Sequence, residues 1–349
     1  MRSEKDACLY FYKTKHIFTV LVIVVDDILL ATNNKNHAKQ FELTMQRKFE
    51  FKSMGSPKYM IGMNLTRGPT YLTISQQEYL REISQRFQIE RDPPTKLPAA
   101  SIMKLTTKGF AGKPDSPSVN IKKYRSIVGA LNYAVLTRPD VATSVSMAAR
   151  FLHCPTEDHM KFARKILRYL HDTKEMKLTY QKTQNPDLVV YADSSHGDDT
   201  ETRRSRYGYM IFLGNALICW KSKLGSGVKL STAEAEYVCA TQACKEIMWV
   251  KHLLKELDKC QKYPVIINED NQACISMSKN PVVSGRNKHM EIKMHYVREC
   301  VKKNEVSLRY IGTRDQLADI LTKNLPSPIF VPIREKIMNP GAHKPMGMC

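Results

Sequence analysis

The segment Leu188–Ser195 (LVVYADSS) is the feature that most constrains the fold of this chain. Its β-branched and aromatic residues predict an apolar strand, and the strand ends on a carboxylate, Asp193, at its polar end. Three later segments each carry another acid: 231–257, 264–280 and 315–325. We therefore expect these segments to meet at the end of that strand.

The segment 231–257 predicts a long helix with Ser231 as its N-cap. Glu234 follows three residues later, which is the spacing of a capping box and gives this acid a structural role. Glu236 lies instead on the apolar stripe of the helix, with Ala240, Ala243, Ile247, Val250 and Leu254. An unpaired carboxylate on a core-facing stripe is unfavourable unless something compensates its charge, and bound metal would do so.

The other two segments place their acids at the ends of secondary-structure elements. The segment 264–280 predicts a strand that continues into a helix, with Asp270 at the change. The segment 315–325 predicts a short helix that carries Asp319 beside apolar residues. Four acids from four separate elements are the arrangement that a metal site requires.

The region 188–326 resembles the ribonuclease H domain of Ty1/copia-type retrotransposon polyproteins. The matching runs follow the order of that family: YADSSHGDD, RRSRYGY, ICWKSK, LSTAEAEY, KEIMW, EDNQA, KNPV, RNKHMEIKMHYVRE and QLADILTKNL. The resemblance implies that two Mg²⁺ ions, replaceable by Mn²⁺, are bound by four ligands: Asp193, Glu236, Asp270 and Asp319.

This chain departs from the family pattern at two places. Ser195 and His196 stand where the family usually has a second acid and a tryptophan. The family also has serine and threonine near Arg206 and Tyr207. These departures bear on the geometry of the strands more than on metal binding.

The segment 17–31 predicts two strands joined at Asp26 and Asp27. The pattern alone favours a turn over a metal site, because Asp is a common turn residue. However, VVDDILLATN resembles the YVDD hairpin in the palm of copia-type reverse transcriptase, with Val24 in place of the usual tyrosine. Two adjacent acids cannot hold two metal ions about 3.5–4 Å apart without a third acid, which this sequence does not supply upstream. We therefore expect no primer extension.

The residues between this hairpin and the ribonuclease H-like region predict strands and helices. The stretches 49–65 and 71–87 resemble the primer-contacting strands and the helix that leaves the palm, with Ser75 as a candidate cap. The five prolines of 92–120 predict a linker. The stretch 124–170 predicts three helices, broken near 138–139 and 154–155, and resembles the family's thumb and connection.

The last of these three helices, 156–171, has an apolar stripe and a basic stripe on opposite faces. The basic stripe consists of Lys161, Arg164, Lys165 and Arg168. Such a stripe is either a solvated face or a track for nucleic-acid phosphates, and we favour the second because no acid interrupts it. Arg203 and Lys223 are surface residues in our interpretation, and His289 and His295 receive no catalytic role.

The predicted fold class is α/β, with a ribonuclease H-like mixed sheet and flanking helices. The expected divisions are the C-terminal part of a reverse transcriptase palm at 1–95, a linker and helical thumb or connection at 96–185, the ribonuclease H-like domain at 186–328, and a fraying tail at 329–349. Trp220 and Trp249 are expected in the core.

The predicted function is that of a fragment of a retrotransposon Pol polyprotein that hydrolyses the RNA strand of RNA/DNA hybrids. The alternatives are a remnant that binds nucleic acid without cleaving it, and a fragment that acts only beside the remaining Pol domains. The net charge of +20, from 54 basic and 34 acidic residues, fits a polyanionic partner.

The composition also bears on location. The nine cysteines form no CxxC pair, which argues against structural zinc and for reduced thiols inside the cell. We see no signal peptide, and the longest apolar run, 17–25, is well short of the ~20 residues of a membrane helix. We therefore expect an intracellular protein, cytoplasmic or nuclear, with no membrane partner.

Overall fold

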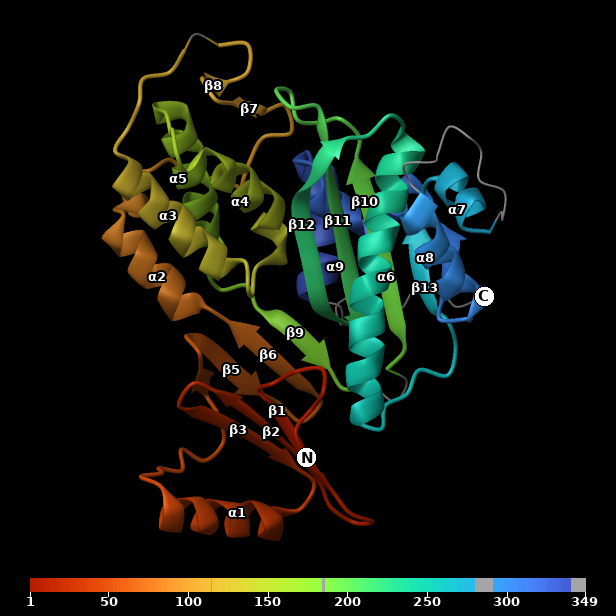
Figure 1. Cartoon of the computed structure of the whole chain (residues 1–349). Helices are drawn as coiled ribbons and strands as arrows, with labels where there is room; N and C mark the ends of the chain where they lie inside the picture. Colours follow the sequence, from red (N-terminus) through yellow and green to blue (C-terminus); the bar gives the residue numbers. More distant parts are fainter. Residues whose placement is uncertain (114, 184–185, 280–290, 340–349) are drawn as a thin grey trace.

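The computed structural model describes residues 1–113, 115–183, 186–279 and 291–339. Figure 1 shows small sheets near the N-terminus, a group of short helices above them, and a five-stranded sheet crossed by the long helix α6 (Thr232–Glu256). The four acids expected to bind metal lie in or beside the five-stranded sheet and α6. The other regions matter for how they support that sheet.

The first small sheet contains the predicted hairpin. Strands β1 (Leu9–Lys13), β2 (Phe18–Val24) and β3 (Asp27–Thr32) pair antiparallel, and helix α1 (Lys35–Lys48) follows. The β2–β3 turn consists of Val25 and Asp26, and Val25 has φ of +56°, a conformation that β-branched residues rarely adopt. This confirms the hairpin, but its turn lies one residue earlier than predicted, because Asp27 is the first residue of β3.

The start of the chain contacts the C-terminal half of α6. Ser3 Oγ donates to Glu256 Oε2 at 2.5 Å, and the indole Nε1 of Trp249 donates to the carbonyl of Lys5 at 3.1 Å. Trp249 is 39% exposed, so the prediction that it lies in the core is wrong. The indole N–H needs a hydrogen-bond partner, and the Lys5 carbonyl provides one at the exposed side of α6.

The second small sheet has the order β4-β5-β6-β9 and is antiparallel throughout. Its strands are β4 (Tyr59–Met60), β5 (Met63–Arg67), β6 (Tyr71–Ser75) and β9 (Leu178–Gln181), and α2 (Gln77–Arg86) follows β6. Ser75 ends β6 and does not cap α2, which corrects our expectation. The N-cap is Gln76. Its side-chain amide does not bond its own helix but donates to the carbonyl of Tyr133 in α3 and accepts from the hydroxyl of Thr137, just after α3.

The helical region forms as predicted, with breaks at the two expected prolines. Its helices are α3 (Ile121–Ala134), the 3-10 turn η2 (Pro139–Val141), α4 (Ala142–Ala148), η3 (Ala149–Phe151) and α5 (Glu157–Asp172). The preceding linker holds η1 (Ile89–Arg91) and the short pair β7 (Leu105–Thr106) and β8 (Gly109–Phe110). Leu105 is buried against the helices, so the linker shares their core.

The five-stranded sheet has the order β12-β11-β10-β13-β14 and is mixed, which confirms the predicted fold class. Its strands are β10 (Leu188–Ser195), β11 (Arg204–Leu213), β12 (Ala216–Val228), β13 (Val265–Glu269) and β14 (Val306–Tyr310). The first three pair antiparallel, whereas β13 pairs parallel with both β10 and β14. The carboxyl ends of β10 and β13 therefore lie at the same edge.

Both faces of this sheet are covered, as Figure 1 shows. On one face, Ile211 and other inward residues pack against α6 and α8 (Glu291–Lys302), and α7 (Gln272–Lys279) completes that layer. On the other face, Met210 and Phe212 join the core of the helical region. Because successive residues of a strand point to opposite faces, β11 serves two separate cores.

The C-terminal residues differ from the prediction. The expected helix at 315–325 consists of the 3-10 turns η5 (Thr313–Asp315) and η6 (Leu317–Leu321), because Gln316 is extended and separates the two turns. The expected fraying tail is wrong for the described residues up to 339. Ser327–Met338 is helix α9, which buries Phe330, Ile333 and Ile337. The prolines at 328 and 332 obscured this apolar spacing in the sequence.

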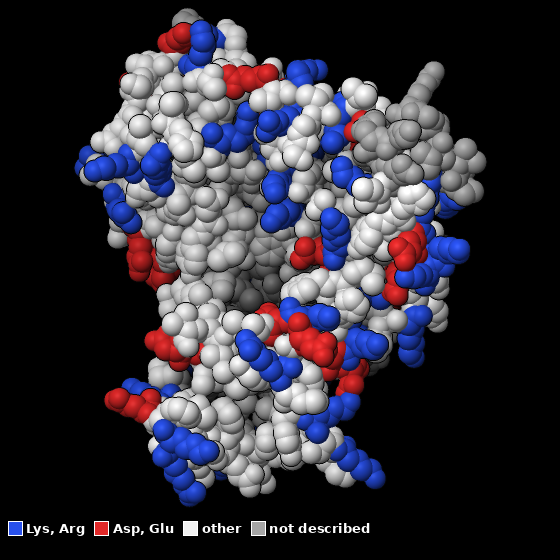
Figure 2. Space-filling view, viewed as in Figure 1, with Lys and Arg blue, Asp and Glu red and all other residues white. Residues whose placement is uncertain are grey.

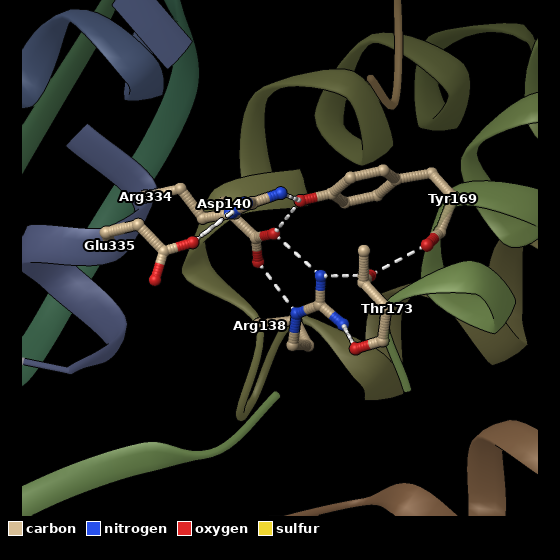
Figure 3. Close-up of polar contacts among 6 residues, drawn as sticks. All are labelled: Arg138, Asp140, Tyr169, Thr173, Arg334 and Glu335. Carbon is tan, nitrogen blue, oxygen red and sulfur yellow. Dashed lines mark hydrogen bonds and ion pairs between the residues drawn. The ribbon is translucent and has the colours of Figure 1, made fainter. Parts of the chain in front are cut away.

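A buried polar network attaches α9 to the helical region (Figure 3). The Arg138 guanidinium donates to both oxygens of Asp140 at 2.9 and 2.7 Å, and Tyr169 Oη donates to Asp140 Oδ2 at 2.6 Å. Arg138 also bonds Thr173 at the end of α5, and Arg334 of α9 reaches Tyr169 Oη at 3.3 Å. Arg138 and Asp140 are 1% and 2% exposed, so this ion pair lies in the core.

Candidate metal centre and nucleic-acid surface

Three of the four predicted acids meet at one end of the sheet. Ligand oxygens of Asp193, Glu236 and Asp270 all lie within 4.8 Å of one another. Asp193 is near the end of β10, Glu236 is in the second turn of α6, and Asp270 follows β13 directly. Asp193 and Glu236 are each 3% exposed, whereas Asp270 is half-buried. The aspartates are close because the carboxyl ends of two parallel neighbouring strands share an edge.

Asp319, the fourth predicted acid, lies beside Asp193 but outside this group of three. Lys323 Nζ is 2.8 Å from Asp319 Oδ1 and 3.9 Å from Asp193 Oδ2, so its ammonium group lies between the two carboxylates. Thr322 Oγ1 also donates to Asp193 Oδ2. The sequence analysis assigned no role to Lys323, which partly neutralises the cluster.

Two further residues hold η6 in place, and the sequence analysis missed both. Gln316, which is fully buried, donates from Nε2 to the Ala192 carbonyl at 2.9 Å and accepts from Ala318 N–H at 3.2 Å. Gly208 stands opposite Asp193 on β11, and a Cβ there would lie 2.5 Å from the Cβ of Leu321. The absence of a side chain at 208 therefore lets η6 approach the sheet and bring Asp319 to Asp193.

Glu269 is a fifth carboxylate that the sequence analysis quoted but did not assign. It is 0% exposed and precedes Asp270 at the end of β13. Its Oε1 accepts from the Asn271 N–H at 3.0 Å, and its Oε2 has no hydrogen-bond partner among the residues described. In the sequence, Glu269 could have been noticed as the one acid in a predicted strand whose other residues are apolar or carry an amide.

The electrostatics of the cluster favour a bound cation. Burial, then the charges of Glu269 and Asp193, raises the pKa of Glu236 to about 11. Burial also raises the pKa of Glu269 to about 8 and, with the charge of Asp193, that of Asp319 to about 7. Glu236 Oε2 and Glu269 Oε2 are buried without a hydrogen bond within the described part of the chain. An all-oxygen set of this kind fits Mg²⁺.

We predict that the metal-free protein becomes less stable as pH rises through the neutral range. The folded-state pKa values of Glu236 and Glu269 lie above their ordinary value of 4.5. The native state therefore holds more protons than the unfolded state, and the free energy of unfolding falls from about pH 5 to beyond pH 8. Urea unfolding in EDTA at several pH values measures this. A profile that rises over that range would contradict it.

Glu234 has the structural role that the sequence predicted. Ser231 Oγ accepts from the Glu234 N–H at 3.2 Å and caps α6. The Glu234 carboxylate accepts from the Leu230 N–H at 2.8 Å, one residue earlier than the capping box predicts, and lies 3.7 Å from Lys229 Nζ. Glu234 and Glu236 are two residues apart on one helix but meet different surroundings.

The remaining candidate residues lie apart from the acids. Asp26 and Asp27 are exposed at the β2–β3 turn, and neither belongs to the one three-acid group found among the described residues. Arg203 and Lys223 are exposed. His289 and most of the KNPV and RNKH runs lie outside the residues that the structure describes.

The basic stripe on α5 is partly occupied by contacts within the chain. Arg164 pairs with Asp92 at 2.7 Å and donates to the Phe87 carbonyl at 3.1 Å. Arg168 donates to the carbonyls of Ile89 and Glu90 at 3.2 and 3.0 Å. Asp92, which neutralises Arg164, comes from elsewhere in the sequence. Asp172, which pairs with Arg168 at 2.9 Å, and Asp158, which lies 3.6 Å from Lys161 Nζ, are on α5 itself. The expectation that no acid interrupts the stripe is therefore wrong. Phosphate binding by this stripe stays a prediction, now resting on Lys161 and Lys165.

We predict different results for the lysines and the arginines of this stripe. Lys161→Ala with Lys165→Ala should reduce the salt dependence of hybrid binding, by about one unit of log–log slope for each lost phosphate contact. Arg168→Ala should leave that slope unchanged but lower the free energy of unfolding by about 2 kcal/mol, because charged hydrogen bonds are lost. Binding isotherms at several salt concentrations and urea unfolding separate the two effects. If all variants show the same salt slope as the wild type, the stripe is not part of the binding surface.

No helix among residues 1–113, 115–183, 186–279 and 291–339 combines the length and apolar character needed to cross a membrane. The cysteines of the described residues are unpaired thiols, and four of them are buried: Cys239, Cys244, Cys274 and Cys300.

Comparison with known proteins identifies relatives over most of the chain. Residues 2–101 match the family model described as reverse transcriptase (RNA-dependent DNA polymerase). The Pol polyprotein from transposon TNT 1-94 of Nicotiana tabacum is 34% identical over 93% of this chain, and this chain spans 25% of its length. A Ty5-1 transposon protein of Saccharomyces cerevisiae is 31% identical over 70% of this chain and 79% of its own length.

A solved structure shows a weak likeness. Ribonuclease H1 from Halobacterium salinarum covers 39% of this chain and 94% of its own, with 12% identity and a TM-score of 0.30, which is too low to support an inference. The sequence relatives are the informative comparison. They confirm the resemblance seen in the motifs, from the VVDD hairpin to the last acidic turn. The chain belongs to the Ty1/copia-type family of retrotransposon Pol polyproteins.

Proposed function

We propose that this chain is a portion of a Pol polyprotein that cleaves the RNA strand of RNA/DNA hybrids. The nuclease would occupy residues 186–328, beside a reverse transcriptase portion at 1–95 and a linker and helical connection at 96–185. One observation carries the proposal: three carboxylates from three elements have ligand oxygens within 4.8 Å of one another at the edge of the sheet. Two of them are almost fully buried, where unpaired charges are otherwise unfavourable.

The candidate ligands are Asp193, Glu236 and Asp270, with Asp319 completing the set beside Asp193. Bound Mg²⁺, or Mn²⁺ in its place, would supply an activated water and stabilise the leaving oxygen of the phosphodiester. The chain's own residues orient the ligands. Thr313 Oγ1 donates to Asp270 Oδ2 at 2.9 Å, and Thr322 donates to Asp193, so each aspartate has one oxygen fixed by a threonine.

Protonation of Glu236 limits the negative charge of the metal-free centre. Glu236, whose pKa is raised to about 11, holds a proton at neutral pH, which avoids placing a buried negative charge beside Asp193. That proton must leave before the carboxylate can act as a ligand, so the affinity for a divalent cation rises with pH. Lys323 limits the repulsion between Asp193 and Asp319 until then.

We infer the substrate class from the net charge of the chain and from the groove shape of nucleic acids. The net charge of +20 suits a polyanion. Figure 2 shows lysine and arginine side chains spread over one face of the molecule, which is hollowed near its centre. A hybrid would be distinguished from duplex DNA by its groove shape and by 2′-hydroxyl contacts.

A cleavage assay tests the proposal. RNA labelled at one end is offered in an RNA/DNA hybrid and in an RNA duplex, and labelled duplex DNA serves as the control. We expect magnesium-dependent cleavage of the RNA in the hybrid, inhibition by EDTA, and intact duplex DNA. Intact hybrid in both Mg²⁺ and Mn²⁺, together with undiminished hybrid binding, would instead favour a remnant that binds without cutting. Lys323 between two of the acids is the feature that fits this second function.

A further inference from the structure

A buried arginine lies on the same strand edge as the acids. Arg206 of β11 stands opposite Ser195, while Gly208 stands opposite Asp193. The two positions are separated by two residues, or about 7 Å along a strand. Arg206 is 3% exposed, and its Nη1 donates to Ser146 Oγ at 2.7 Å, beside α4. Its guanidinium therefore lies between the five-stranded sheet and the helical region.

No acid forms an ion pair with Arg206 among the residues that the structure describes. The nearest acids have other partners: Asp199 pairs with Arg150, and Asp198 lies 3.3 Å from Lys104 Nζ. Asp199 also accepts from the N–H and hydroxyl of Thr202, both at 2.7 Å. The charges of Asp198 and Asp199 therefore act on Arg206 only from beyond ion-pair distance, and each of these acids has a closer basic partner.

Arg206 lines a small open pocket that contains more positive than negative side chains. The lining residues include Lys104, Arg150 and Arg206, against Asp198 and Asp199. Burial, followed by the charge of Arg150, lowers the pKa of Arg206 to about 10. A buried guanidinium without a direct ion pair is unfavourable, so an anion in the pocket would offset the desolvation of Arg206.

We propose that this pocket binds one backbone phosphate of the nucleic acid that lies across the acidic centre. The planar donor fork of a guanidinium matches phosphate oxygens, and Lys104 adds a second, half-exposed cation at the pocket. Position 206 lies about 7 Å along β11 from position 208, which stands opposite Asp193, and this rise equals the axial rise of about two nucleotides. The inference rests on the proposed function for the identity of the polymer.

The first test measures hybrid binding in EDTA, which prevents cleavage, at a series of salt concentrations. Arg206→Met should lower the log–log salt slope by about one unit. Arg206→Lys keeps the charge without the fork, and it should preserve the slope while weakening binding. The control is Arg81→Met, because Arg81 is exposed on α2 and pairs with Glu78 and Glu175. We expect the control to match the wild type.

The second test separates a polymer phosphate from a free one. Inorganic phosphate should raise the Tm of the wild type above that in sodium chloride of equal ionic strength, and it should not raise that of Arg206→Met. A wild-type salt slope in Arg206→Met would overturn the proposal, even if free phosphate stabilises the protein. If Arg206→Met does not fold, Lys104→Met, at a half-exposed side chain, should still lower the slope. If Arg206→Met lowers the salt slope but the wild type never cleaves the hybrid, the result supports this pocket and rejects the proposed nuclease activity.

Discussion

Replacing Glu236 with Gln should abolish cleavage of the hybrid. The substitution keeps the shape of the side chain but removes a carboxylate whose ligand oxygen lies within 4.8 Å of those of Asp193 and Asp270. Electrostatic stabilisation by a bound metal contributes several kcal/mol, and each 1.4 kcal/mol is tenfold in rate, so we expect a loss of about a thousandfold or more. Single-turnover cleavage of labelled RNA measures it.

The same variant should be at least as stable as the wild type without metal. The amide that Glu236→Gln introduces carries no charge at any pH, so burial and the charges of Glu269 and Asp193, which raise the pKa of Glu236, do not destabilise the variant as pH rises. Magnesium should then stabilise the variant much less than the wild type. The matched control is Glu234→Gln, two residues away, which should lose only capping energy of about 1 kcal/mol and retain activity. Full activity in Glu236→Gln would reject the proposed centre.

Asp140→Asn should lower the free energy of unfolding by about 3–5 kcal/mol, because it leaves Arg138 charged and unpaired in the core. Burial alone would raise the pKa of Asp140, but the charge of Arg138 and its hydrogen bonds outweigh that effect and lower it. The network also holds Tyr169, which contacts Arg334 of α9 (Figure 3). Urea unfolding at neutral pH measures the loss.

A surface ion pair provides the control for this experiment. Asp92 pairs with Arg164 at 2.7 Å, but both side chains are about a quarter exposed. Asp92→Asn should therefore change stability by no more than about 1 kcal/mol. Similar losses for Asp140→Asn and Asp92→Asn would show that the buried network contributes no more than an ordinary surface pair.

The sequence alone predicted the sheet and the acids that local patterns single out. Asp193 lies near the end of a strand, Asp270 directly follows one, and Glu236 interrupts an apolar stripe, so each stands out against its neighbours. Glu269 and Gln316 do not stand out, because their importance comes from contacts with distant parts of the chain. Gln316, for example, bonds the Ala192 carbonyl, 124 positions earlier. Such contacts are properties of the folded chain and leave no periodic signal.

The basic stripe on α5 and the helix α9 both show how a local sequence pattern can mislead. A one-helix pattern cannot show that Arg168 bonds the carbonyls of η1, and it therefore overstated the charge available for nucleic acid. Conversely, weak periodicity led us to expect a frayed tail where α9 buries four large apolar residues. In both cases tertiary packing, which local propensity does not contain, decided the outcome.

The most direct test of the metal centre is calorimetric titration with magnesium near pH 7, repeated in two buffers of different ionisation enthalpy. Glu236, with its pKa raised to about 11, is protonated in the metal-free protein and must lose its proton before it can act as a ligand. We predict saturable binding that releases about one proton or more per protein molecule. In Glu236→Gln, the proton released by that residue should be missing. Magnesium binding with no proton release, or no binding at all, would contradict the assignment of these buried carboxylates as a metal centre.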